Sequence, residues 1–402
     1  MAAFAHLDAG FEKSKTFLIF ITVKILLLSD TFSEHTEKWA LSLANRGLQI
    51  GLFSFNKASY EWYNHPNITI FFEPDTKINA ESTLTKLAYL KYVSILKKII
   101  KHFQPDILHA HYATSYGFVG ALSGFHPYVI SSWGSDVMKF PNKNFVAKSI
   151  LKYNFRSADA LCATSYVVKD YISKISVKPV AVIPFGIDGD VFKPYKRVSP
   201  FGEGCFVIGC IKSLENIYKI DVLIRAFSVL EKKHPGARLM IIGHGSQAEK
   251  LQQLVKELGL EEKVLFTGRV PFSEVANYYN MLDVLVNISE YESFGVSVIE
   301  AMACGKPVVV SNVGGLMEIV ENDTLGLKVN VNAVDETAEA IEHLMTDPEL
   351  YASISENARK HVSEKYNWEN NLSDMIRLYD EIKLAEAEKT LAKKVKKETK
   401  KN

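Results

Sequence analysis

The chain has 402 residues, which exceeds the length at which one hydrophobic core stops growing, so we expect two domains. Hydrophobic residues make up 47% and aromatic residues 11% of the chain, and this content excludes a largely disordered protein. The formal net charge of +1 provides no overall field that would attract nucleic acid or an acidic partner.

The chain begins with an apolar stretch at residues 17–28 that follows two lysines, as in a secretory signal peptide. The stretch is too short to span a bilayer, Lys24 interrupts it, and no small-residue cleavage site follows. We therefore predict that residues 23–28 form the first buried strand of an α/β domain and that residues 1–22 are an extension outside the fold. The alternative is a membrane-associating leader.

Short β-branched runs alternate with amphipathic helical patterns through the first half of the chain. The helical patterns cover 34–45, 84–102 and 144–156, and apolar runs such as DILHAH and DALCAT lie between them. Near-continuous apolar strands separated by helices indicate a parallel sheet that is covered on both faces. We predict such a domain over residues 23–190.

A segment at 191–204 that contains Pro and Gly is the expected linker, and the same rhythm restarts after it. We predict a second domain over 205–366 and one more amphipathic helix at 367–385. The expected fold class is α/β, with two tandem Rossmann-like, doubly wound parallel-sheet domains that face each other across a cleft. Ligands bind outside the carboxyl ends of such strands, so the cleft is the expected active site.

The chain ends in a basic tail at 386–402. From Lys383 to Asn402 the sequence contains eight Lys and three Glu. We expect a solvated, frayed tail. The alternative is a patch that contacts an anionic membrane, because each Lys near such a surface adds about 1 kcal/mol.

The four cysteines are Cys162, Cys205, Cys210 and Cys304. No cluster of His or Cys accompanies them, which argues against a zinc site and against a disulfide scaffold. We therefore expect small, buried thiols in a protein of the reducing cytosol.

The most informative stretch runs from Glu292 to Glu300 (ESFGVSVIE) and follows the apolar run DVLVNI. Gly295 lets the backbone come close to a ligand, and the residues after it open a helix whose free amides suit a phosphate group. Glu292, in the loop, can accept hydrogen bonds from sugar hydroxyls, and Glu300, in the helix, can reach a ribose. The alternative is that two carboxylates share a solvated helix by chance.

The stretch has a specific continuation, with a helix that ends at Gly305, a strand VVVS that begins after Pro307, and the pair Gly314-Gly315. Residues 289–326 closely resemble the family-4 retaining glycosyltransferases. The hallmark of that family is a Glu, seven residues and a second Glu, followed by a Pro-started strand and Gly-Gly. The resemblance extends over most of the chain. It implies a two-domain fold of the GT-B type, with a nucleotide-sugar donor held mainly by the second domain, the acceptor by the first, and a final helix that crosses back.

The resemblance also implies roles for individual residues of the stretch. It assigns Glu292 to the donor sugar and Glu300 to the ribose of the donor. It places the main-chain amides of Phe294, Gly295 and Val296 beside the sugar or the diphosphate.

Two basic residues are expected near the diphosphate. Lys212 stands where the resemblance implies an Arg, just after the first strand of the second domain. Lys219 is the second candidate, although it falls where the family usually has Gly and Tyr218 occupies the usual Lys position. The alternative for Lys219 is a solvated lysine at a helix start. The loop Gly268-Arg269-Val270 resembles the one that holds the nucleobase.

The first domain departs more from the family pattern. Residues 29–35 stand where family members often carry Gly-Gly, and Trp133 stands near the usual position of a His. Trp133 can stack on a sugar ring but cannot relay a proton, so we place it on the acceptor side. Asp136 matches a family position, and we count it as catalytic together with Glu292 and Lys212.

Two histidines, His109 and His111, end the run DILHAH at the cleft side of the first sheet. We count His111 as a second acceptor-side candidate. A satisfied structural histidine is the alternative at both positions.

Two further motifs carry less weight. Residues 243–248 match a dinucleotide-binding fingerprint but lie on the second strand–helix unit of their domain, so we interpret Gly243 as part of a loop that borders the nucleotide cleft. Asp188 and Asp190 have the spacing of a metal-binding pair, but no further carboxylates accompany them, so we interpret them as structural. The resemblance likewise implies no metal and no cofactor.

The expected reaction is transfer of a sugar from a UDP- or GDP-linked donor to an acceptor hydroxyl, with retention at the anomeric carbon, in surface polysaccharide or other glycan biosynthesis. As the resemblance implies, the leaving diphosphate assists deprotonation of the acceptor, while Lys212 and helix amides stabilise the developing charge. The alternatives are a GT-B nucleotide-sugar epimerase, a non-catalytic nucleotide-sugar-binding scaffold and a dehydrogenase.

The expected partners are the nucleotide-sugar and a glycan or lipid-linked glycan acceptor, and no nucleic acid. The expected location is the cytoplasm, either free or peripheral at the inner face of the membrane through the basic tail.

Overall fold

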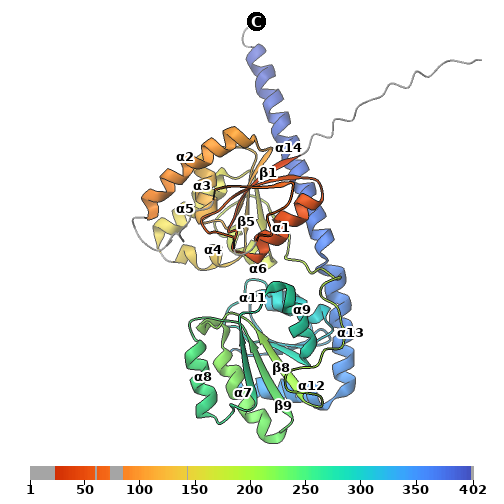
Figure 1. Cartoon of the computed structure of the whole chain (residues 1–402). Helices are drawn as coiled ribbons and strands as arrows, with labels where there is room; N and C mark the ends of the chain where they lie inside the picture. The colour runs from red at the N-terminus through yellow and green to blue at the C-terminus, as the bar shows by residue number, and fades with distance from the viewer. Residues whose placement is uncertain (1–22, 59–60, 73–84, 143, 400–402) are drawn as a thin grey trace, which may run out of the picture.

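The computed structural model describes residues 23–58, 61–72, 85–142 and 144–399. The predicted extension at 1–22 lies outside these residues. The chain forms two α/β bodies, one above the other in Figure 1, and the last long helix leads from the second body past the first.

The first sheet is built from the N-terminal half of the chain. Within the described residues it has seven parallel strands in the order β3-β2-β1-β4-β5-β6-β7. They are β1 (Lys24–Leu28), β2 (Gln49–Phe53), β3 (Ile68–Phe72), β4 (Ile107–His111), β5 (Tyr128–Ser132), β6 (Ala160–Ala163) and β7 (Val180–Val182). The strand order reverses between β1 and β4, and such a switch point leaves a crevice at the carboxyl ends of the strands.

Helices cover this sheet on both faces, so the middle of β1 is fully buried, as the apolar run predicted. The predicted helices at 34–45, 84–102 and 144–156 are confirmed to within one residue at each end by α1, α2 and α5. The elements are α1 (Glu34–Asn45), α2 (Thr85–Phe103), α3 (Ser115–Ser123), α4 (Ser135–Met138), η1 (Phe140–Asn142), α5 (Phe145–Ser157) and α6 (Tyr166–Ser173).

The second sheet is also parallel and is built from the C-terminal half of the chain. Its six strands in the described part of the chain are parallel and have the order β10-β9-β8-β11-β12-β13. They are β8 (Phe206–Ile211), β9 (Ala237–Ile242), β10 (Val264–Gly268), β11 (Val284–Asn287), β12 (Val308–Ser311) and β13 (Leu327–Val329). The helices are η2 (Asn216–Tyr218), α7 (Ile220–Lys233), α8 (Ala248–Glu257), α9 (Phe272–Met281), α10 (Val296–Ala303), α11 (Gly314–Ile319), α12 (Val334–Thr346) and α13 (Pro348–Lys365). The predicted class of two doubly wound parallel-sheet domains is therefore confirmed.

The last helix, α14 (Trp368–Glu398), crosses from the second domain to the first. At its start, the ring of Trp368 packs edge-on against Trp39 of α1, with ring centroids 4.6 Å apart. The indole nitrogen of Trp368 also donates a hydrogen bond to the Ser42 hydroxyl over 2.8 Å. Buried aromatic packing therefore fixes the point at which the chain returns.

The basic stretch continues this helix instead of fraying. We predicted a helix that ends at 385, whereas α14 runs on to Glu398. Lys383 pairs with Asp106 at 3.3 Å and Lys389 with Asp159 at 3.6 Å. These contacts with the first domain hold the helix beyond the part that packs in the core.

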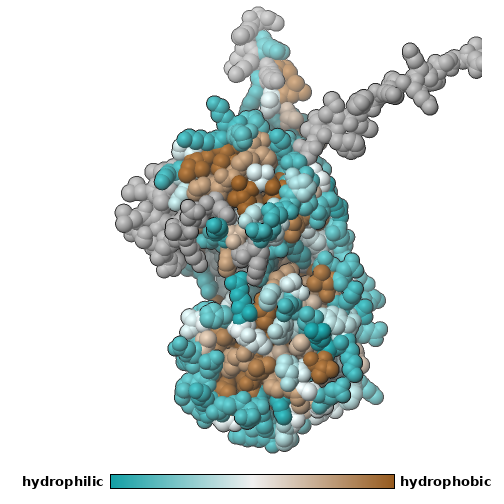
Figure 2. Space-filling model, viewed as in Figure 1, coloured by the Kyte–Doolittle hydropathy of each residue, from teal (hydrophilic) through white to brown (hydrophobic). Residues whose placement is uncertain are grey.

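The two domains also touch directly beside the predicted site. The carboxylate of Glu318, on α11, accepts hydrogen bonds from the backbone nitrogens of Tyr166 at 2.9 Å and Val167 at 2.5 Å, where α6 begins. A carboxylate at a helix N-terminus is favoured by the helix dipole. The Ser165 hydroxyl donates to the carbonyl oxygen of Ser293 over 2.7 Å. In Figure 2 the outline of the molecule narrows at the level where the domains meet.

All four cysteines are free thiols, and three of them, Cys162, Cys210 and Cys304, are buried. Burial raises the pKa of these three thiols to about 12, so they behave as small apolar side chains, as expected. Among the helices within the described ranges, none combines the length and the apolarity that a membrane span requires.

Candidate active site

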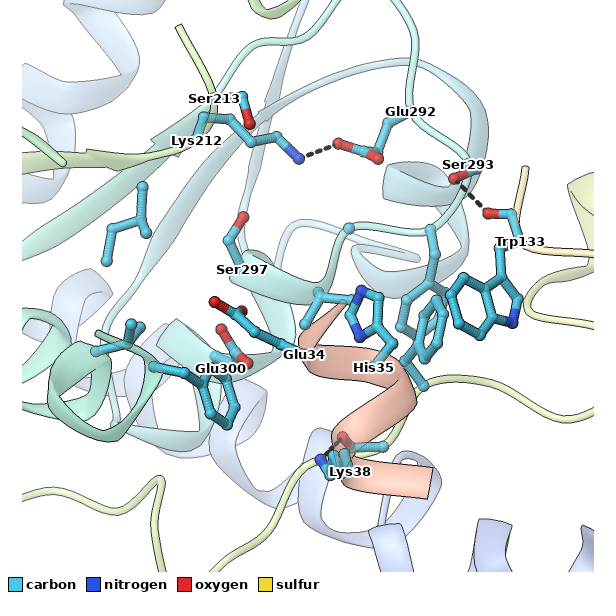
Figure 3. Close-up of a pocket in the computed structure, with 18 of the residues that line it drawn as sticks. Glu34, His35, Lys38, Trp133, Lys212, Ser213, Glu292, Ser293, Ser297 and Glu300 are labelled. Carbon is cyan, nitrogen blue, oxygen red and sulfur yellow. Dashed lines mark hydrogen bonds and ion pairs between the residues drawn. The ribbon is translucent and has the colours of Figure 1, made fainter. Parts of the chain in front are cut away.

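A cleft of about 510 Å³ lies between the two domains, at the carboxyl ends of their strands. Figure 3 shows that side chains enter it from both domains. The polar residues that line it are Glu34, His35, Lys38, Tyr112, Ser135, Lys212, Ser213, Tyr218, Tyr279, Glu292, Ser293, Ser297 and Glu300. The cleft is therefore a crevice at strand ends with both acidic and basic groups, which is the usual form of a binding site in such folds.

An ion pair between Lys212 and Glu292 lies at the upper end of the cleft in Figure 3. Lys212 follows β8 and Glu292 lies in the loop before α10, and their side chains are only 15% and 11% exposed. Burial is the largest single effect on the pKa of Lys212 and lowers it, but the charge and hydrogen bond of Glu292, together with Tyr218 and Cys210, raise that pKa above its usual value. The ammonium group of Lys212 is therefore charged although it is largely removed from solvent.

The Gly314-Gly315 pair holds the Glu292 loop in place. The backbone nitrogen of Gly315 donates to the Glu292 carbonyl oxygen over 3.0 Å. Gly314 has φ +48°, and a Cβ on it would lie 2.1 Å from the same oxygen. Because no side chain fits there, the glycine pair is a requirement of this loop.

The helix α10 begins at the cleft wall. Phe294, Gly295 and Val296 line the cleft, and Gly295 has φ +113° as the chain turns into the helix. The first amides of a helix favour an anionic group, so the start of α10 and Lys212, which line the same cleft, are both suited to one.

Ser297, which the sequence analysis did not single out, lines the same wall. Its hydroxyl oxygen is buried and has no hydrogen-bond partner among the residues that the structure describes. A buried hydroxyl without a partner inside a cleft is a candidate ligand contact.

Glu300 lies deeper in the cleft, on α10. The Tyr279 hydroxyl donates a hydrogen bond to its Oε2 over 2.8 Å. Burial raises the pKa of Glu300 to about 7, against the lowering effects of Tyr279 and of the positive charge on Lys38. The carboxyl group therefore changes its charge near neutral pH.

Helix α1 of the first domain supplies three titratable cleft residues that the sequence analysis missed. Figure 3 shows Glu34 beside Glu300, so two carboxylates from opposite domains approach each other. The Lys38 ammonium group donates to the Gly186 carbonyl oxygen over 2.7 Å. The His35 ring stacks on Phe185, with centroids 4.0 Å apart, and burial lowers the pKa of His35 to about 4. One feature of the sequence could have indicated these residues. The helix α1 directly follows the carboxyl end of β1, and ligands bind at the carboxyl ends of such strands.

Asp136 does not line the cleft. It is 1% exposed, and its carboxylate accepts hydrogen bonds from the backbone nitrogens of Gly134 at 2.9 Å and Ala113 at 2.7 Å. Burial raises its pKa, although these hydrogen bonds act in the opposite direction. Asp136 therefore braces the loop that carries Trp133, which does line the cleft.

The two histidines of β4 do not line the main cleft. The ring nitrogens of His109 lie 2.7 Å from the Tyr379 hydroxyl and 2.8 Å from the Ser131 hydroxyl, so His109 is a satisfied structural residue. His111 lies 2.8 Å from the Ser29 hydroxyl and lines a second, adjoining pocket. Burial lowers the pKa of both rings, which keeps them neutral.

The remaining predicted residues surround the cleft without lining it. Lys219 pairs with Glu290 at 2.8 Å, and the guanidinium of Arg269 lies 4.9 Å from the ring centre of Phe32. Val270 packs against the core of the second domain. Gly243 approaches the Lys212 backbone so closely that a Cβ would lie 1.9 Å from the Lys212 carbonyl oxygen.

The Asp188 and Asp190 pair forms a local turn. The Asp190 nitrogen donates to the Asp188 carboxylate over 2.9 Å, which supports the structural interpretation. In the part of the chain that the structure describes, no group of three or more His, Cys, Asp or Glu is arranged to hold a metal ion.

Two family models match the chain, one for each domain. Residues 191–361 match the model of glycosyl transferases group 1, and residues 24–165 match the glycosyl transferase 4-like model. Together these matches include both walls of the cleft.

Individual proteins that are similar to this chain include glycosyltransferases, in agreement with the two family models. An uncharacterized glycosyltransferase of Methanocaldococcus jannaschii is 39% identical over 160 residues, which is 40% of this chain and only 41% of that protein. A second one from the same organism is 29% identical over 329 residues, covering 81% of this chain and 88% of the relative. N-acetyl-alpha-D-glucosaminyl L-malate synthase of Bacillus anthracis is 27% identical over 367 residues, covering 85% and 91%.

Solved structures share the arrangement of the two domains. A sucrose-phosphate synthase from Thermosynechococcus elongatus superposes with a TM-score of 0.77 at 22% identity, covering 90% of this chain and 100% of that one. Anabaena HepE, in complex with UDP and glucose, superposes with a TM-score of 0.72 at 21% identity, covering 89% and 99%. The fold is the GT-B fold of these glycosyltransferases.

Proposed function

The chain belongs to the glycosyl transferase group 1 family, and we propose that it transfers a sugar from a nucleoside diphosphate donor to an acceptor hydroxyl with retention at the anomeric carbon. The proposal includes the finer assignment of a hexosyl or N-acetylhexosaminyl group, carried by UDP or GDP, without a metal ion or cofactor. The solved structure of HepE is a complex with UDP and glucose, which supports a uridine nucleotide as the first candidate.

The observation that carries this proposal is the line of groups along the second-domain wall of the cleft. A desolvated ammonium group on Lys212, the first turn of α10 and the buried carboxyl of Glu300 follow one another in Figure 3. A diphosphate suits the first two groups and a ribose diol suits the third. Glu292, beside the ammonium group, suits the hydroxyls of the transferred sugar.

In the proposed mechanism, the donor diphosphate replaces Glu292 as the ion-pair partner of Lys212. The ammonium group is already desolvated and charged, so it stabilises the negative charge that develops as the anomeric bond breaks. A departing phosphate oxygen accepts the proton of the attacking hydroxyl, which approaches from the same face of the sugar. Closure of the two domains excludes water and limits hydrolysis of the donor.

A thermal-shift screen of nucleotide-sugars tests the donor site. We expect UDP- or GDP-sugars to raise the midpoint of unfolding in proportion to the logarithm of their concentration, because they bind only the folded state. NAD serves as the control and should have no effect. If a donor binds but no acceptor in a broad panel releases free nucleotide, the non-catalytic scaffold would be favoured. Turnover of the donor without any acceptor would indicate an epimerase.

The affinity for the nucleoside should depend on pH through Glu300. Since its pKa is about 7 in the free protein, and a carboxylate is the stronger acceptor for two ribose hydroxyls, the affinity for uridine should rise as the pH increases from 6 to 8. The expected rise is about 5- to 10-fold, following the ionised fraction. Isothermal titration calorimetry with uridine measures this, since the nucleoside carries no phosphate that titrates in this range.

Glu300→Gln is the control for this pH dependence. The groups around Glu300 are Tyr279, Lys38, Glu34 and Lys212, and all of them remain in this variant. Uridine affinity should become independent of pH. An affinity of the unaltered protein that stays constant from pH 6 to 8 would contradict the assignment of Glu300 to the ribose.

A further inference from the structure

A second pocket, of about 370 Å³, opens at the carboxyl ends of β1, β2, β4 and β5 in the first domain. It lies at the point where the strand order of the first sheet reverses, which is where such sheets bind ligands. Tyr112 and Trp133 line both this pocket and the main cleft, so the two spaces adjoin across these two rings. A molecule in the second pocket can therefore present a group to the donor cleft.

The chemistry of this pocket differs from that of the donor cleft. Its polar side chains are one carboxylate, Asp30, together with serine and tyrosine hydroxyls, the Asn56 amide and the neutral ring of His111. No Lys or Arg is among the described residues that line it. Among the residues that the structure describes here, an anionic group inside the pocket would therefore meet a carboxylate and no compensating cation.

The carboxylate of Asp30 accepts one hydrogen bond at each oxygen. One carboxylate oxygen accepts from the Phe32 backbone nitrogen at 3.0 Å, and the other accepts from the Asn56 side-chain amide at 2.8 Å. An ionised carboxylate has about four acceptor positions, so about two remain for a ligand. Hydroxyl groups are the partners that such positions favour, since a hydroxyl bonded to a carboxylate makes a strong, charge-assisted hydrogen bond.

We propose that this pocket binds the acceptor, that the acceptor part held there is a neutral polyhydroxyl ring such as a sugar or cyclitol, and that Asp30 excludes rings carrying phosphate or carboxylate. The Trp133 ring provides an apolar face for the ring, and Asp30 accepts hydrogen bonds from its hydroxyls. This inference rests on the proposed glycosyl transfer and adds the chemical class of its acceptor.

The test measures release of nucleotide diphosphate from UDP-glucose, UDP-N-acetylglucosamine and GDP-mannose with paired acceptors. The pairs are myo-inositol and inositol 3-phosphate, and glucose and glucose 6-phosphate. Because like charges in contact repel each other, kcat/KM should be about 100-fold higher for the neutral member. A higher kcat/KM for the anionic members, or no stimulation by any neutral member, would overturn the proposal.

Asp30→Asn tests the residue itself. The neutral amide keeps the size of the side chain, so kcat/KM for the neutral acceptor should fall by about tenfold, while the KM for the donor stays unchanged. The ratio between neutral and anionic acceptors should also narrow by at least tenfold, which a merely structural role would not cause. Asp170→Asn makes the same chemical change on the exposed face of α6, outside both pockets, and should leave both values unaltered.

The thermal shift by the donor separates the two levels of the proposal. If no nucleotide-sugar stabilises the protein, the proposed function fails. If the donor stabilises both the unaltered protein and Asp30→Asn, and the acceptor ratio is the same in both, then only the assignment of this pocket is wrong.

Discussion

Lys212→Met should lower kcat/KM for sugar transfer by about 10²- to 10³-fold, which is the usual cost of removing one group that stabilises a developing negative charge. Methionine keeps the length and the packing of the side chain but removes the ammonium group. Glu292→Gln should also lower transfer, because an amide accepts weaker hydrogen bonds from the sugar than a carboxylate does. Release of nucleotide diphosphate at saturating acceptor measures both effects.

The pair formed by Lys263 and Glu231 is the matched control. It is also a Lys–Glu pair in the second domain, with side chains 29% and 18% exposed, but it lies outside the cleft. Lys263→Met should change transfer by less than twofold, because partly exposed pairs contribute about 1 kcal/mol or less, and only to stability. Full transfer activity in a folded Lys212→Met protein would show that the leaving group is neutralised elsewhere.

The effect of Lys212 should be larger than that of Lys219. The sequence placed both lysines near the diphosphate, but the structure brings only Lys212 into the cleft. Lys219 has φ +51° at the start of α7 and directs its ammonium group to Glu290. The sequence shows how far apart the two lysines are along the chain, but it does not show that Glu290 pairs with the ammonium group of Lys219. The difference between the two lysines is therefore visible only in the folded structure.

The sheets were predictable because their physical signal is local. Each strand is a nearly continuous apolar run, and each helix such as α1 has a regular apolar face, so the alternation is visible without knowledge of contacts. The Glu292 to Glu300 stretch was predictable for the same reason, since the loop, Gly295 and the helix start are consecutive in the chain.

The parts that were not predictable depend on contacts between distant segments. Glu34 and Lys38 belong to the first domain, whereas Glu300 belongs to the second, and all three line the same cleft. Lys38 also contacts the ring of Trp368, at the start of the helix that crosses between the domains. The basic tail forms ion pairs with Asp106 and Asp159, which lie more than 200 residues earlier in the chain, so these contacts are not visible in its composition. Asp136 matched a family position, yet only the fold shows that both of its oxygens face backbone amides.

Gly314→Ala should destabilise the protein and also impair transfer. The φ of +48° costs an alanine about 1–2 kcal/mol, and the added Cβ would lie 2.1 Å from the Glu292 carbonyl oxygen. Overpacking of this kind adds about 1–3 kcal/mol, so the free energy of unfolding should fall by about 2–5 kcal/mol in total. A displacement of the Glu292 loop by about 1 Å would cost about 10²-fold in kcat/KM.

Gly202→Ala separates the strain of the backbone from the clash with the loop. Gly202 has φ +86°, but a Cβ there would have no atom within 4 Å, so this variant carries the conformational cost alone. Chemical denaturation should show a loss of about 1–2 kcal/mol, and transfer should remain normal. If Gly314→Ala resembled Gly202→Ala in both measurements, the contact between Gly314 and the Glu292 loop would not set the position of that carboxylate. If only Gly314→Ala lost transfer at temperatures where both variants are folded, the glycine pair would be needed to position Glu292 beside Lys212.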